Sequence, residues 1–340
     1  STCLASKGSS HAQSARSAAM IRPWAVIAFL RAVPAAAGQI RANLRMPMPA
    51  SFIYYGSKGF GGLAEYYAGD VKVAFAPVQD AALQQQLADA AAAAAASMRD
   101  LARWLDQNAA TATQDFALGP QRFARMLRDT EAVDTSLDEL ERVGRADLQR
   151  NQSALREACA RYAPGASIPA CMARMNARKP VQGPVQAAAA QIPELRAFVL
   201  EKDLVSIPGT EQALVRESPP YNRQNSAYID PPGPYEKGIP SIYYISPPDP
   251  AWTPAVQAAF LPGESDLLFT TVHEVMPGHF LQFLHANRSP SLFGRLYVGY
   301  AYAEGWAHYA EELMWEAGLR GTPETHIGQI SNALLRDCRF

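Results

Sequence analysis

The sequence has little of what marks several functional classes. Its 31 lysines and arginines nearly balance 32 aspartates and glutamates, so the net charge of −1 gives no basic surface for nucleic acid. No apolar run approaches the ~20 residues that a membrane-spanning helix needs. The glycine-rich stretch at 56–69 lacks G-x-G-x-x-G and a following lysine, so we expect a loop that binds no phosphate. The oligomeric state is left open by these features.

Cysteine is also scarce, with four residues in the chain. Cys159 and Cys171 are close enough in sequence for a small-loop disulfide between two helices, and no C-x-x-C zinc pair is present. A disulfide slightly favours a periplasmic or secreted protein, and two reduced core thiols are the alternative. No signal peptide is evident, since Arg31 interrupts the apolar segment at 20–34, where we expect a core helix instead.

Helical periodicity dominates the first 200 residues and then ends. We expect a disordered tail at 1–19, a helical domain at 20–200, and a metal-binding catalytic region at 201–340 that is incomplete at its C-terminus. Ten of the 26 prolines lie between 208 and 250 and exclude long helices there. Residues 241–246 predict a short strand, either an edge strand that holds a substrate backbone or a purely structural hairpin.

Two histidines and a carboxylate lie within seven residues in an otherwise helical run. His273 and Glu274 are adjacent, as in H-E-x-x-H zinc peptidases, but His279 is at i+6 rather than i+4. On a straight helix the two imidazoles would point about 120° apart. Pro277, which clashes with the carbonyl four residues back, and Gly278 predict a break that turns His279 back toward His273. The alternative is a helix that ends before the proline and a second helix with His279 as its polar start.

A second acidic segment lies on one predicted helix, expected to run from about 292 to 317. Glu304, His308 and Glu311 fall at i, i+4 and i+7, on one face. Because the neighbours of Glu304 are aromatic residues and alanines, we expect a buried carboxylate that needs a cation or hydrogen bonds. A solvated acidic stripe is the alternative. Together, the two segments predict a metal site.

These motifs also carry a family resemblance. His273-Glu-x-x-Pro-Gly-His279-x-Leu-Gln, followed by Glu304-Gly-Trp-Ala-x-Tyr-x-Glu311, resembles the bacterial "domain of unknown function 885" family, whose members are expected to be zinc metallopeptidases. Residues 228–235 and 242–249 resemble it too, and the likeness extends more weakly back to about residue 20. The family pattern begins earlier and continues past the end of this chain.

The resemblance implies a mainly α, multi-helix, zinc-peptidase-like fold with a short proline-rich β and loop segment beside the metal helix. It implies one Zn²⁺ held by His273, His279 and Glu304, with Glu274 as the base that activates metal-bound water for peptide hydrolysis. His308 stands where the family has an apolar residue, so it is a candidate fourth ligand.

Other residues are candidates for supporting roles. Tyr228, Tyr300 and Tyr302 are possible oxyanion donors, and His308 or Glu311 could orient a ligand. Two alternatives to a zinc peptidase remain: a non-catalytic metal-binding scaffold descended from one, and a zinc amidase or esterase. Retention of Glu274 argues against the scaffold, because a structural site needs no base.

Overall fold

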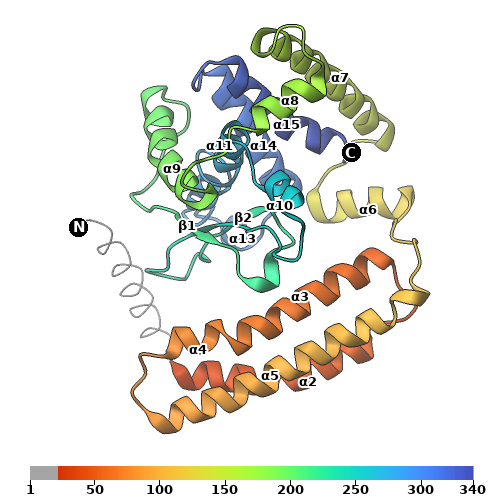
Figure 1. Cartoon of the computed structure of the whole chain (residues 1–340), viewed down its shortest axis with the longest axis vertical. Helices are drawn as coiled ribbons and strands as arrows, with labels where there is room; N and C mark the ends of the chain where they lie inside the picture. The colour runs from red at the N-terminus through yellow and green to blue at the C-terminus, as the bar shows by residue number, and fades with distance from the viewer. Residues whose placement is uncertain (1–21, 340) are drawn as a thin grey trace. The chain divides into compact units, whose positions relative to one another are not determined.

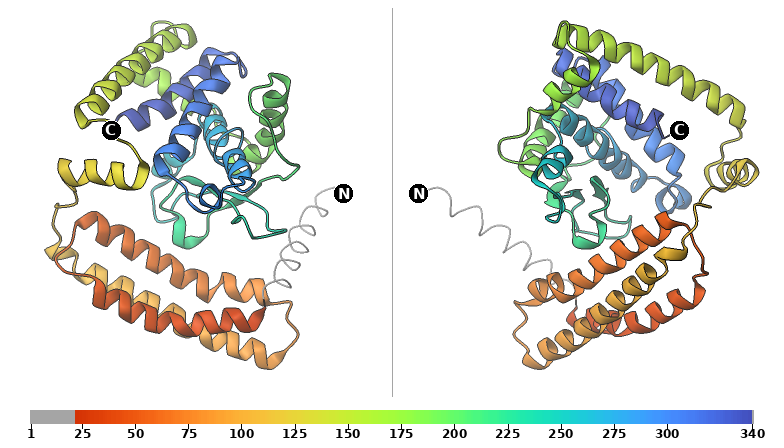
Figure 2. Two further views of the ribbon diagram at one scale, coloured as in Figure 1. Left: turned by 180° about the vertical axis from the view of Figure 1, so that it is seen from behind. Right: turned by 45° about the vertical axis from the view of Figure 1, so that its right-hand side comes forward.

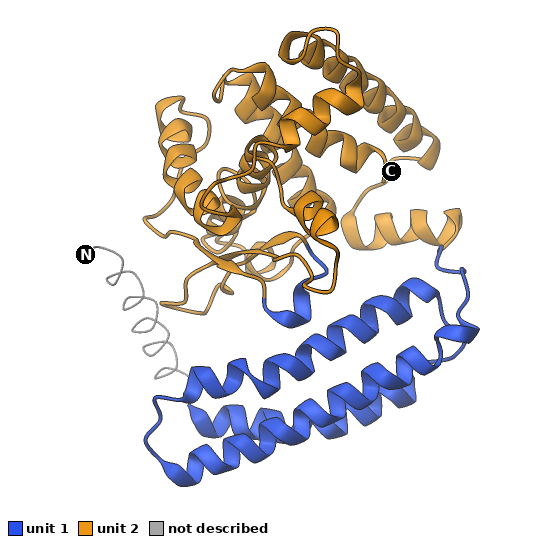
Figure 3. Ribbon diagram, viewed as in Figure 1, with its two compact units in different colours: residues 1–117, 219–225 blue, residues 118–218, 226–340 orange. Residues whose placement is uncertain are grey.

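The structure is a computed structural model that describes residues 22–339 (Figure 1). The expected tail at 1–19 lies outside the described residues. The chain forms two compact units: unit 1 comprises residues 1–117 and 219–225, and unit 2 comprises 118–218 and 226–340 (Figure 3). The boundary expected near residue 200 falls inside unit 2, directly after a helix that packs on the sheet and on the central helix of that unit. Helices dominate and one small sheet is present, which confirms the mainly α fold class.

Unit 1 is built from three long helices that lie side by side (Figures 1 and 2). Asp80 caps the longest, α5, by accepting hydrogen bonds from the backbone N–H groups of Ala82 and Leu83 at 2.9 and 3.0 Å. The buried alanines at 90, 91, 94 and 95 of α5 let its neighbours approach closely. The elements are α2 (Pro23–Asn43), α3 (Ala50–Ala68), α4 (Asp70–Phe75), α5 (Ala81–Gln107), η1 (Ala109–Thr111) and η2 (Pro220–Asn222).

Helix α2 combines two properties. Its Ile27, Leu30 and Val33 are buried in the core shared with α5. It is also the one helix among residues 22–339 that is long and apolar enough by composition to cross a membrane, and only 22% of its most apolar 18-residue window is buried. Trp24 and Phe29 are exposed on its other face. Length and composition alone do not make it a membrane span.

The expectation of a loop at 56–69 is wrong, because residues 56–68 belong to α3 and Gly69 alone separates it from α4. A Cβ on Gly62 would lie 2.3 Å from the carbonyl oxygen of Pro220, so only glycine allows η2 to pack against the helix backbone. Tyr66 and Tyr221 complete this contact with ring centroids 5.2 Å apart. The glycine at this position therefore serves helix packing rather than loop flexibility.

Unit 2 surrounds the central helix α11 with α9, α14 and α15 (Figure 1). Leu268, Val272 and Val275 are fully buried in its core, as their spacing predicts. The helices of this unit are α6 (Pro120–Glu131), α7 (Leu137–Tyr162), α8 (Ile168–Asn176), α9 (Pro184–Glu201), α10 (Pro254–Phe260), α11 (Glu264–Glu274), α12 (His279–Ala286), α13 (Leu292–Leu296), α14 (Tyr300–Glu316) and α15 (Pro323–Asp337).

A three-stranded sheet lies beside α11, in the order β1 (Leu214–Glu217), β3 (Ile242–Ile245), β2 (Ala227–Asp230). β3 pairs in parallel with β1 and antiparallel with β2. The strand predicted at 241–246 is present, but it is the central strand, which corrects the expectation of an edge strand. Both of its edges are already occupied by neighbouring strands.

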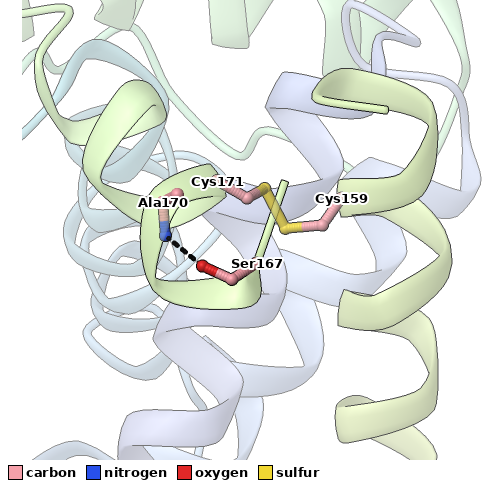
Figure 4. Close-up of a disulfide and its surroundings, with 4 residues drawn as sticks. All are labelled: Cys159, Ser167, Ala170 and Cys171. Carbon is pink, nitrogen blue, oxygen red and sulfur yellow. Dashed lines mark hydrogen bonds between the residues drawn. A yellow bond between two sulfur atoms is a disulfide. The ribbon is translucent and has the colours of Figure 1, made fainter. Parts of the chain in front are cut away.

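Cys159 and Cys171 form a disulfide between the end of α7 and the first turns of α8, with Cα atoms 5.8 Å apart (Figure 4). Ser167 caps α8 by accepting a hydrogen bond from the backbone N–H of Ala170 at 3.4 Å. Cys338 is free and exposed. The predicted disulfide between two helices is thus present, and the second helix begins before Cys171 rather than after it.

The single helix expected from about 292 to 317 is divided. α13 ends where Tyr297 adopts an extended backbone with φ −117° and ψ 129°, and α14 begins after Gly299. The helical pattern of the sequence continues across this gap, so periodicity alone did not reveal it.

Candidate metal centre

The Pro-Gly insertion separates two helices instead of bending one. α11 ends at Glu274, and the backbone N–H of Gly278 donates to the carbonyl of Val272 at 3.0 Å, so the regular i→i−4 pattern is broken. His279 begins α12, as in the alternative interpretation of the sequence. The break nevertheless brings the two imidazoles together, with ring centroids 4.7 Å apart and planes at 88°.

Gly278 is the residue that permits this turn. A Cβ there would lie 1.8 Å from the carbonyl oxygen of His273 and 2.5 Å from that of Val272. The chain after α11 therefore passes directly over the last turn of the helix. Trp306 secures the same turn from α14, because its indole N–H donates to the carbonyl of Pro277 at 3.0 Å.

His273, His279 and Glu304 form a group whose ligand atoms all lie within 4.8 Å of one another. Nε2 of His273 lies 3.4 Å from one Glu304 oxygen, and Nε2 of His279 lies 3.7 Å from the other. Tetrahedral zinc with bonds of about 2.0–2.2 Å needs ligand atoms about 3.3–3.6 Å apart. The donor set is one that binds zinc, and the two distances to Glu304 are close to this separation, although the group as a whole is bounded only by 4.8 Å.

Glu304 is more exposed than its sequence neighbours suggested. Its side chain is 54% exposed, so the expectation of a buried carboxylate is wrong. The aromatic residues around it, Tyr300 and Tyr302, are themselves exposed and do not cover it. Its carboxylate still meets two imidazoles, and their hydrogen bonds hold the pKa of Glu304 well below its ordinary value.

Glu311 contacts the Nδ1 side of His273, away from Glu304. Its fully buried carboxylate lies 2.8 Å from Nδ1 of His273 and 2.8 Å from a guanidinium nitrogen of Arg336. That same guanidinium nitrogen is also 2.8 Å from Nδ1. A carboxylate only accepts, so all three groups are satisfied when Nδ1–H and Arg336 both donate to Glu311. When His273 is neutral, as a metal ligand must be, this arrangement keeps its proton on Nδ1 and leaves the Nε2 lone pair directed at the cluster.

Arg336 is the residue of this site that sequence reasoning missed. It lies on α15, whose close packing on α11 is set by Gly328, where a Cβ would meet the Ser265 carbonyl at 2.6 Å. Asn332 adds a hydrogen bond to Asp266 at 2.8 Å. Arg336 is 63 positions from His273, and no local motif connects them.

Metal-free His273 has an altered affinity for protons. Burial disfavours its charged form, but the Glu304 and Glu311 carboxylates outweigh burial and raise its pKa to about 9. In His279, Nδ1 is buried and has no hydrogen-bond partner among residues 22–339. The two histidines are thus held differently, one by a carboxylate and one by packing.

Glu274 is buried next to this group. Burial raises the pKa of its carboxyl, and the nearby histidines oppose that effect. The backbone N–H of Ile229 on β2 also favours the charged carboxylate and so opposes the rise in its pKa. Ser246 donates its backbone N–H to the carbonyl of Ser226, so this pair and every second pair along β2 and β3 are hydrogen-bonded. Ile229 falls at one of the alternate, non-hydrogen-bonded positions, and its backbone N–H and C=O therefore point away from β3. The edge strand beside the site is therefore β2.

The remaining predicted site residues lie around the centre. His308 is not a member of the three-residue group; burial lowers its pKa, and its Nδ1 has no partner within the described part of the chain. Tyr228 stacks on Tyr244 with centroids 5.0 Å apart. Tyr300 is exposed, and Tyr302 lines a cavity on the opposite face of α14 from Glu304. Glu311, the fifth candidate, contacts the proposed ligand His273 directly.

Comparison with known proteins gives relatives but no activity. None of the curated proteins matches the chain. A lipoprotein candidate of unknown function from Shewanella oneidensis has a similar structure, with a TM-score of 0.61 and 22% identity over 92% of this chain and 60% of its own. A second lipoprotein candidate, from Colwellia psychrerythraea, gives a TM-score of 0.63 and 18% identity over 84% of this chain and 52% of its own.

These likenesses show a shared fold, and this chain spans roughly half to three fifths of the length of those proteins. A family model described as "Bacterial protein of unknown function (DUF885)" matches residues 11–340. The chain belongs to the DUF885 family of bacterial proteins of unknown function.

Proposed function

We propose that this chain is the metal-binding part of a zinc-dependent hydrolase that cleaves peptide bonds. The observation that carries the proposal is the convergence of His273, His279 and Glu304 at zinc-ligand spacing, with a buried carboxylate, Glu274, directly beside them. A bound zinc ion would supply Lewis-acid polarisation of the scissile carbonyl and lower the pKa of water.

Glu274 is the proposed general base and acid. Its carboxylate takes a proton from the attacking water and later delivers it to the nitrogen of the leaving amine. Burial raises the pKa of this carboxyl, which strengthens it as a base, and the backbone N–H of Ile229 favours its charged form. Glu311 and Arg336 hold the His273 imidazole in the tautomer that leaves Nε2 unprotonated.

The outward edge of β2 is the proposed platform for the substrate backbone. Ile229 already places its N–H next to Glu274, so an extended peptide along this edge would lie beside the base. This assigns to β2 the role expected of residues 241–246, because β3 is covered on both sides.

Two readouts separate this function from its rivals. Glu274→Gln should retain one zinc per chain and lose peptide hydrolysis by at least about 100-fold. A scaffold would bind zinc but cleave nothing in the wild-type form. An esterase or amidase would cleave the corresponding small esters or amides and leave a peptide library intact. Metal analysis together with a peptide-library digest by mass spectrometry distinguishes all three, and wild-type protein that cleaves no peptide contradicts the proposal.

We also propose an extracytoplasmic location. The Cys159–Cys171 disulfide persists in oxidising compartments, and the two structural relatives are lipoprotein candidates. Fractionation of cells that express the native gene, with thiol labelling of Cys159 and Cys171, tests this proposal. Reduced cysteines in a cytoplasmic fraction would contradict it.

A further inference from the structure

Helix α2 of unit 1 has an apolar outward face. Its inner face packs on α5 through buried residues such as Leu30. A surface helix of a globular protein normally carries charged and polar side chains on the side opposite its core-facing stripe. The outward face of α2 is exposed, and on a regular helix its members lie within about 140° of one another. They are all uncharged: Trp24, Ala25, Ala28, Phe29, Ala32, Ala35, Ala36 and Gln39.

Trp24 and Phe29 are the large side chains of this outward face, and they are 58% and 60% exposed. From Trp24 to Gln39 the face is about 23 Å long. α2 packs mainly on α5, and only 22% of its most apolar 18-residue window is buried. An exposed apolar surface of this length is typical of a site that another molecule or a membrane covers.

The charges near the outward face are all positive. Residues 1–64 contain five arginines and two lysines, and the first carboxylate of the chain is that of Glu65. The guanidinium of Arg22 lies over the Trp24 ring, 5.9 Å from its centroid, and Arg31 donates to an amide oxygen on α5 at 3.1 Å. Neither arginine has a carboxylate partner among residues 22–339. Two uncompensated cations therefore flank an apolar surface, a combination that suits an anionic partner with an apolar interior.

We propose that the outward face of α2 binds an anionic lipid membrane, with the helix lying in the plane of the headgroups. Tryptophan and phenylalanine insert at the boundary between headgroups and acyl chains, and arginines beside them attract anionic headgroups. The helix does not cross the bilayer, because its inner face belongs to the core shared with α5 and Arg41 is ion-paired with Asp100 of α5 at 3.7 Å.

The charge pattern also favours a membrane over a second copy of this chain. A symmetric dimer through the outward face would place the same patch of both protomers in one interface. Arg22 and Arg31 of each protomer would then enter that interface without a carboxylate on either side. Anionic headgroups supply the counter-charge that a second copy lacks.

The test is co-sedimentation of the purified chain with lipid vesicles. We expect the partition coefficient for equimolar phosphatidylglycerol and phosphatidylcholine vesicles to exceed that for pure phosphatidylcholine by about 10–30-fold, and this excess to disappear in about 1 M salt. Trp24→Ala and Phe29→Ala should each reduce the partition coefficient about tenfold. The double variant Arg22→Gln with Arg31→Gln should bind both kinds of vesicle equally.

Matched controls make the same chemical changes elsewhere in unit 1. Phe116→Ala removes a phenylalanine that is 61% exposed but lies outside α2. Arg99→Gln with Arg103→Gln removes two exposed arginines of α5. Both controls should partition as the wild type does, and the melting temperature of every variant shows whether it is folded.

The oligomeric state separates the two occupants of the outward face. Sedimentation velocity without lipid should give the same species for the wild type and Trp24→Ala. A dimer that Trp24→Ala dissociates, together with no binding to vesicles, would assign the face to a second copy and overturn the proposal. Equal binding to both kinds of vesicle, or the same loss of binding in Phe116→Ala as in Phe29→Ala, would also overturn it.

Discussion

Gly278→Ala tests the turn on which the metal centre depends. The new Cβ would lie 1.8 Å from the carbonyl oxygen of His273, and a separation of at least 3.0 Å is needed, so the backbone must move by about 1.2 Å. Metal–ligand distances tolerate only about ±0.2 Å. Because His279 directly follows this residue, we expect zinc affinity to fall by about 100-fold or more. Overpacking of this kind also costs about 1–3 kcal/mol of stability.

Gly305→Ala is the matched control for the same chemical change. Gly305 lies in α14 next to Glu304, and nothing lies within 4 Å of the position that a Cβ would occupy there. Alanine in a helix is better than glycine by about 0.5–1 kcal/mol, so this variant should bind zinc normally and melt slightly higher. Zinc affinity is measured by competition with a chromophoric chelator, and folding by circular dichroism. A folded Gly278→Ala protein with wild-type affinity would refute the reasoning.

Three further predictions follow from the same contacts. Arg336→Met should weaken zinc binding by about 10–100-fold, because the buried Glu311 loses the partner that lets it orient His273. Arg336→Lys should retain part of the wild-type zinc affinity. Equal zinc affinity in the wild type and both variants contradicts this role. Replacing both Cys159 and Cys171 with serine should cost about 3 kcal/mol in urea unfolding, whereas Cys338→Ser should change stability by less than about 0.5 kcal/mol. In zinc-free protein, burial opposes charging of His273, but Glu304 and Glu311 raise its pKa to about 9, above the unfolded value of 6.5. The stability that His273 contributes is therefore complete below pH 6.5 and is lost as the pH rises through 9. The urea midpoint measured in EDTA should fall between these pH values, and it should fall less in His273→Gln. An equal fall in the wild type and in His273→Gln would contradict the assignment.

The ligand group could be predicted from sequence because its constraints are local. His273 and Glu274 are adjacent, and the i+6 spacing to His279 requires a helix break that Pro277 and Gly278 supply. From sequence alone, Pro277 and Gly278 predict this break together. The structure adds that Gly278 passes so close to the His273 carbonyl that no side chain fits there. The break was predictable, but the atom responsible for it depends on the path of the chain.

Other features depend on contacts between distant segments. Arg336 reaches the site through the packing of α15 on α11, which no local pattern encodes. Gly62 reads as a loop residue until η2 is seen against its backbone. Glu304 reads as buried because its neighbours are apolar, yet Tyr300 and Tyr302 are exposed beside it. Periodicity reports the composition of a helix face and not whether another element covers it.

The position of a zinc ion in crystals is the most direct test of the central claim. Diffraction data collected on both sides of the zinc absorption edge, from protein grown with zinc, give an anomalous difference map. The account predicts one strong peak about 2.0–2.2 Å from Nε2 of His273, Nε2 of His279 and a Glu304 oxygen. No peak at this position, or a peak held by other residues, would contradict it.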